Sequence, residues 1–194
     1  MSRTYPPAKI EAQYRDALGS QDPIESMRKA PLRLRKLIHG RSKPQRTRRA
    51  ASGAWSVKEV LAHLADAEMV FGTRLRFVAA MERPTIVGYD QNAFVANLAY
   101  DAVEVADISA EFAALRAMNV ALLERLPRAA FTRIGRHSER GDESLVAMVF
   151  RAAGHDRIHE AQIARLLSSA PQRAPSAGVG PPSRSPRARI ARAK

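Results

Sequence analysis

The sequence predicts an all-α protein, a four-helix bundle with a long crossover loop and flexible basic termini. Four stretches of the 194-residue chain repeat apolar side chains at helical spacing, with Pro, Gly or a capping residue between them. Few stretches alternate apolar and polar residues, so the pattern argues against a sheet. The chain has no Cys, yet it is long enough to bury a core without disulfides.

The first two helices have clear starting signals. One helix begins after Asp22, a capping residue followed by Pro23 at the first helical position, and ends near His39. The next begins at Ser56, and Glu59 three residues later completes a capping box. Its apolar stripe ends before Pro84.

The other two long helices are predicted from periodicity and breakers. The third covers about 108–126 and ends at Pro127, and the fourth covers about 143–168. A shorter helix over about 8–18 is expected upstream of the bundle, after two consecutive prolines.

The connections and ends divide the chain. We expect an N-terminal extension at 1–21, the bundle at 22–168, and a disordered basic Pro/Arg-rich tail at 169–194. Residues 40–54 form an Arg-rich break, while the connections 83–106 and 127–142 are longer than a bundle requires. Long ordered loops often carry function, and a plain crossover between parallel helices is the alternative.

The basic charge lies mainly outside the bundle. Of the net +13, residues 1–50 carry +9 and 171–194 carry +6, whereas 51–170 carry −2. Aromatic residues do not interleave with the basic ones, so we expect at most weak contact of the basic flanks with nucleic acid. No signal peptide and no run of roughly 18 apolar residues is present, which predicts a cytoplasmic protein with no membrane partner.

Three histidines are the main functional candidates. His155 and His159 are spaced i, i+4 in a helical segment, so their imidazoles share one face. His63 lies on the inward side of the second helix. Three neutral imidazoles would hold a divalent metal and leave a coordination position open, although buried histidines with hydrogen-bond partners are the alternative.

Four motifs, taken together, make a family resemblance visible. The segments are WSVKEVLAHLADAE, GYDQNAFV, GRHSERGDESL and AGHDRIHEAQI. In this order they resemble the DinB-like superfamily, which includes YfiT-type and bacillithiol-transferase-type proteins, over about residues 22–168. The resemblance implies a four-helix bundle that binds one divalent metal through His63, His155 and His159.

The resemblance also suggests the chemistry. Zn and Ni are the first candidates for the metal, with Fe(II) and Co as further options, since neutral imidazoles suit all four. The activities implied are transfer to or from a small thiol such as bacillithiol, or hydrolysis of a small-molecule substrate. The residues alone do not choose between these two reactions.

Other polar residues are weaker candidates. His137, in the loop of the GRH motif, could line the pocket or act as an acid or base, or simply fix a turn. Asp156 is expected to be a surface charge, and Glu59 to serve its capping box rather than the metal. Candidates for supporting the metal ligands or lining a pocket are Asp66, Glu68, Gln162, Tyr89, Asp90 and Asn92.

Two alternatives to an enzyme remain open at this stage. The chain could be a stress-associated metal-binding protein without turnover, or it could contact nucleic acid through its basic flanks. Relatives of this type are often homodimers, so a homodimer is also expected.

Overall fold

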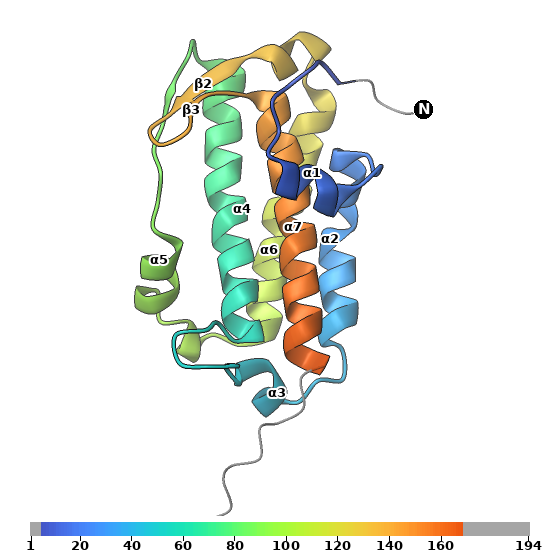
Figure 1. The fold of residues 1–194 in the computed structure, drawn as a ribbon, viewed down its shortest axis with the longest axis vertical. Helices are drawn as coiled ribbons and strands as arrows, with labels where there is room; N and C mark the ends of the chain where they lie inside the picture. Colours follow the sequence, from blue (N-terminus) through green and yellow to red (C-terminus); the bar gives the residue numbers. More distant parts are fainter. Residues whose placement is uncertain (1–4, 169–194) are drawn as a thin grey trace, which may run out of the picture.

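The computed structural model describes residues 5–168, and the predicted C-terminal tail lies outside them. Its four long helices are α2 (Pro23–Ile38), α4 (Val57–Ala80), α6 (Val105–Arg125) and α7 (Leu145–Ser168). They lie side by side as a bundle in which α2 and α4 each pack against both α6 and α7 (Figure 1). The predicted four-helix bundle is therefore confirmed, with α6 beginning three residues earlier than expected.

The directions of α4 and α6 explain why the crossover between them is long. Helices α4 and α6 run in the same direction, so the chain must return along the bundle between them (Figure 1). This return carries α5 (Gln91–Asn97) and a 3-10 turn, η1 (Tyr100–Ala102). A second 3-10 turn, η2 (Arg128–Thr132), follows α6.

Helix starts are fixed by the predicted caps. Asp22 accepts a hydrogen bond from the backbone N–H of Glu25 at the start of α2. At the start of α4, Ser56 and Glu59 form the complete capping box. These caps satisfy N–H groups that the first helical turn leaves without partners. They also fix where α4 begins, and therefore where its inward-facing residues lie.

A small sheet corrects the expectation that the chain has none. The strands β1 (Thr85–Ile86), β2 (Ile134–His137) and β3 (Gly141–Ser144) pair in that order, β1–β2 parallel and β2–β3 antiparallel. The sheet covers the end of the bundle where α4 finishes and α7 begins (Figure 1). Strands of two to four residues are too short to show alternation in the sequence.

A glycine allows the sheet to pack closely on α4. A Cβ added at Gly135 would lie 2.6 Å from a carbon of Ile86 and 2.7 Å from a carbon of Val78. Any larger residue would therefore push β2 away from β1 and α4. Because Ile86 pairs with His137 in the sheet register, this packing also fixes the position of His137.

Helices α1 and α3 are short and, like α5, lie outside the bundle. Helix α1 (Ala12–Leu18) begins four residues later than predicted and packs against α7. Helix α3 (Lys43–Thr47) lies in the Arg-rich break and has its own capping box. None of the described helices is long and apolar enough to cross a membrane.

Candidate metal centre and pocket

The three histidines meet inside the bundle. Nε2 of His155 lies 3.0 Å from Nε2 of His63 and 3.1 Å from Nε2 of His159. One ring nitrogen from each residue lies within 4.8 Å of the other two. Helix α4 contributes the first imidazole and α7 the other two, one turn apart as the i, i+4 spacing predicts.

Burial keeps these imidazoles neutral. His63 is 1% exposed, and burial, with the nearby His159, lowers its pKa from 6.5 to about 3. Burial likewise lowers the pKa of His155 well below its usual value, and neighbouring positive groups lower it further. The pKa of His159 is also lowered by burial. A metal ion needs neutral imidazoles as ligands, and these three are neutral near pH 7.

A hydrogen bond selects the nitrogen of His159 that would face a metal. Nδ1 of His159 lies 2.7 Å from Oε1 of Gln162, an acceptor, so Nδ1 carries the proton and Nε2 carries a lone pair. With metal–nitrogen bonds of about 2.0–2.1 Å, two ligand nitrogens lie about 2.8–3.0 Å apart at a right angle and about 3.3–3.4 Å apart at the tetrahedral angle. The two closest Nε2 pairs here, at 3.0 and 3.1 Å, lie between these limits. The residues present therefore fit a divalent metal.

A pocket of about 240 Å³ opens beside the histidines. Residues at successive turns of α4 and α7 form its length, and residues of the crossover and of the β2–β3 hairpin close it. This volume is below the roughly 300–1,000 Å³ of most ligand pockets, so only a small molecule or part of one would fit. Its lining includes His63, His155, Tyr89, His137, Arg74, Arg140 and Arg151.

The sequence of this bundle places it in a known family. Residues 26–163 match the DinB superfamily. The chain belongs to the DinB superfamily.

Two relatives of this chain are described as metal-dependent hydrolases. A "putative metal-dependent hydrolase" of Geobacillus kaustophilus is 27% identical over 164 residues, which cover 84% of this chain and 92% of the relative. A second protein of the same name, from Oceanobacillus iheyensis, is 31% identical over 116 residues, or 59% of this chain and 66% of the relative.

A solved structure has the same fold. YfiT from Bacillus subtilis, described as "a probable metal-dependent hydrolase with an unusual four-helix bundle topology", superposes with a TM-score of 0.71 at 23% identity. The match covers 84% of this chain and 91% of YfiT. At that identity the likeness establishes the fold.

Two of the predicted supporting residues of this DinB bundle, Asp66 and Asp90, form hydrogen bonds with groups other than the imidazoles. Oδ1 of Asp66 accepts a hydrogen bond from the Tyr100 hydroxyl at 2.6 Å, and burial raises the pKa of Asp66. Oδ2 of Asp66 and Nδ1 of His63 are both buried without a hydrogen-bond partner among the described residues, so no hydrogen bond joins these two atoms. Asp90 caps α5 through the N–H groups of Asn92 and Ala93, outside the pocket lining.

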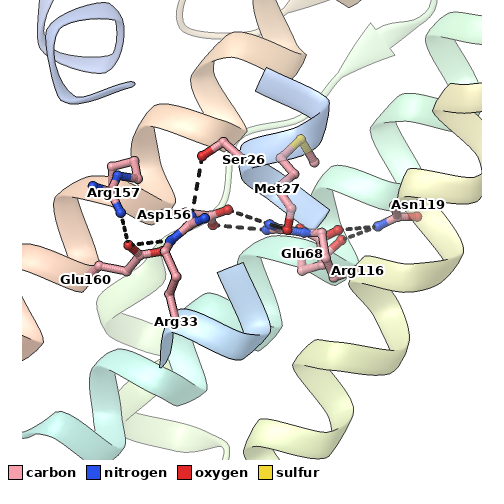
Figure 2. A network of polar contacts seen from close by, with 9 residues as sticks. All are labelled: Ser26, Met27, Arg33, Glu68, Arg116, Asn119, Asp156, Arg157 and Glu160. Atoms are coloured by element: carbon pink, nitrogen blue, oxygen red, sulfur yellow. Dashed lines mark hydrogen bonds and ion pairs between the residues drawn. The ribbon is translucent and has the colours of Figure 1, made fainter. Parts of the chain in front are cut away.

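A buried ion-pair network next to the histidines was missed by the sequence analysis. Arg116 of α6 donates to both oxygens of Asp156, at 2.5 and 3.0 Å, and to Glu68 at 2.7 Å (Figure 2). Asn119 also donates to Glu68, at 2.9 Å. All four side chains are buried, so the prediction that Asp156 is a surface charge is wrong. Glu68 serves this network, and its hydrogen bonds go to Arg116 and Asn119.

This network links the helices that carry the histidines. Asp156 follows His155 on α7, and Glu68 lies on α4 one to two turns after His63. Arg116 therefore joins the two ligand-bearing helices through α6. The sequence did offer a signal, since Arg116 and Asn119 fall on the same helical stripe as buried Phe112 and Leu123.

A second ion-pair group lies one turn further along α7. Glu160, which follows His159, accepts hydrogen bonds from Arg33 at 2.9 Å and from Arg157 at 2.5 Å (Figure 2). Because Arg33 belongs to α2, this contact fixes α7 against a third helix. Asp156 and Glu160, which follow the two α7 histidines, thus link α7 to α6 and to α2.

Proposed function

We propose that this chain is a divalent-metal-dependent enzyme acting on a small molecule, with hydrolysis as the favoured reaction. The observation that carries the proposal is the convergence of three neutral Nε2 atoms at the wall of a small pocket. Structural metal sites are closed by protein ligands, whereas a three-histidine set leaves a position open towards the pocket. The names of the two relatives agree with this choice.

The residues have separate roles in this proposal. His63, His155 and His159 hold the ion, and Gln162 fixes the tautomer of His159. When bound, the metal supplies Lewis acidity towards a group in the pocket. The donor set suits Zn or Ni, with Fe(II) or Co as further options.

Transfer involving a small thiol is the second candidate reaction. The chain contains no Cys, so a thiol for such a reaction has to enter the pocket from solution. Activity that requires an added low-molecular-weight thiol would favour the transferase. Turnover of esters or amides without thiol would favour the hydrolase.

The first experiment measures metal content by mass spectrometry after purification and after zinc or nickel loading. We expect about one equivalent in the parent and none in His63→Ala or in His155→Ala/His159→Ala. His39→Ala is a matched control, because His39 is exposed at the end of α2 and remote in sequence from the cluster. A parent that takes up no divalent metal would overturn the proposal.

A second experiment separates an enzyme from a metal-binding protein without turnover. The metal-loaded parent and His63→Ala are assayed with p-nitrophenyl acetate and with an aryl amide, each with and without added thiol. Metal-dependent turnover supports the enzyme. A metal-dependent rise in Tm with no turnover of either substrate supports the non-enzymatic alternative.

A further inference from the structure

Three arginines gather at the end of the pocket next to the sheet. Arg74 comes from α4, Arg151 from α7, and Arg140 from the turn between β2 and β3. Each affects the pKa of His137, which lies among them at the end of β2. Two helices and the β2–β3 turn thus bring cationic groups to one part of the wall.

Two of these arginines already have carboxylate partners. Arg151 forms ion pairs with Glu11, at 2.5 Å, and with Glu143. Arg140 shares Glu143, at 2.9 Å. Their charges are therefore largely compensated within the protein.

Arg74 differs from the other two. Within residues 5–168 it forms no ion pair; it donates to the backbone oxygen of Val87 at 2.5 Å and lies 5.7 Å from the centre of the Tyr89 ring. Burial and the charge of Arg140 lower its pKa. Glu139, another carboxylate of the lining, attracts Arg74 electrostatically but forms no ion pair with it. Arg74 is therefore a half-buried cation without a direct carboxylate partner among the described residues.

His137 adds a hydrogen-bond donor without a partner. The side chain is 2% exposed, and its Nδ1 accepts a hydrogen bond from the backbone N–H of Glu139 at 3.1 Å. The neutral ring therefore carries its proton on Nε2, which is buried and has no partner among the described residues. Burial and the nearby Arg140 and Arg74 lower its pKa to about 4, so the ring stays neutral near pH 7.

We infer that this end of the pocket binds an anionic group of the substrate, a carboxylate or a phosphate, through Arg74 and the Nε2–H of His137. A buried donor without a partner and a guanidinium without an ion pair both gain from an anionic oxygen acceptor. His137 is then a hydrogen-bond donor and not the general base, since neither nitrogen is free to take a proton. Only the statement that the anionic ligand is a substrate rests on the proposed function.

The geometry also orients that substrate. Arg74 follows His63 by eleven residues on α4, about three helical turns, and both side chains line the same pocket of about 240 Å³. The reacting group of the substrate then lies at the metal end of the pocket and its charge at the sheet end.

The test compares benzoate with benzamide, which have the same shape and differ in charge. Binding to the full chain is followed by NMR titration, with metal-free and with zinc-loaded protein. We expect benzoate to bind at least fivefold more tightly than benzamide in both forms, and to shift the Arg74 and His137 signals. Arg74→Gln should abolish the difference, and His137→Leu should reduce it more than His137→Gln, whose amide can still donate.

Arg136→Gln is the matched control, because Arg136 is exposed on β2 beside His137 and outside the pocket lining. It should leave the preference for benzoate unchanged. Equal affinities for the two probes, no detectable binding of benzoate, or equal effects of Arg136→Gln and Arg74→Gln would overturn the inference. Metal content measured on the same samples keeps this result separate from failure of the metal site.

Discussion

Replacing Arg116 with Met tests the buried network most directly. Arg116 is 2% exposed, and it binds Asp156, Glu68 and the backbone oxygen of Met27, the last at 3.0 Å. Met has similar length but no charge, so two buried carboxylates lose their counter-charge while the volume is nearly kept. Removing one partner of a buried ion pair costs about 3–5 kcal/mol of unfolding free energy, and we expect a loss in that range.

The loss is measured by urea unfolding followed by circular dichroism and by fluorescence of Trp55, the only tryptophan. Arg125→Met, at the exposed end of the same helix, should change stability by less than about 0.5 kcal/mol. The triple variant Arg116→Met/Glu68→Gln/Asp156→Asn should recover a large part of the loss, because no uncompensated charge remains. A single-variant loss below about 1 kcal/mol, or a triple variant as unstable as the single one, would refute the reasoning.

Three further predictions address single contacts. Gly154→Ala should lower stability by about 1–3 kcal/mol in urea unfolding, although Ala favours helices, because its Cβ would lie 2.3 Å from the backbone oxygen of Tyr14. A gain in stability would show that α1 does not pack on α7. Gln162→Leu should weaken zinc binding about 10–100-fold in a chelator competition, since His159 loses its orienting partner; unchanged affinity would contradict this. His137 takes up a proton near pH 4 when folded and near pH 6.5 when unfolded, so its neutral form stabilises the protein as pH rises through that window. Between pH 7 and pH 5 the parent should therefore lose about 2 kcal/mol more than His137→Asn, and equal losses would count against a buried neutral ring.

The bundle was predictable because its signals are local. Caps at Asp22 and Ser56 and apolar residues at helical spacing are contained within one helix each, and the structure confirms them. The sheet was not predictable in the same way. Its strand β1 has two residues and pairs with residues about fifty positions away in β2, so no pattern within either segment reveals it.

In the candidate site, too, local features were predictable from the sequence and long-range contacts were not. The α7 histidines could be placed on one face from spacing alone, whereas their approach to His63 requires the bundle to assemble. Asp156 was assigned to the surface because a single acidic residue on an amphipathic helix usually lies there. Its partner Arg116 is forty residues away on another helix, and only the pair explains why either is buried.

The pocket wall depends on contacts that are the least visible in the sequence. Arg74 and His63 share a helix, but Arg140 and His137 reach the same pocket only because the β2–β3 hairpin folds back over α4. Gly135 permits that approach, and it lies two residues before His137. A larger residue at Gly135 should therefore move His137 and weaken anion binding while leaving the three metal-binding histidines in place. If Gly135→Val instead reduced zinc uptake and benzoate binding equally, the two ends of the pocket would have to be a single structural unit.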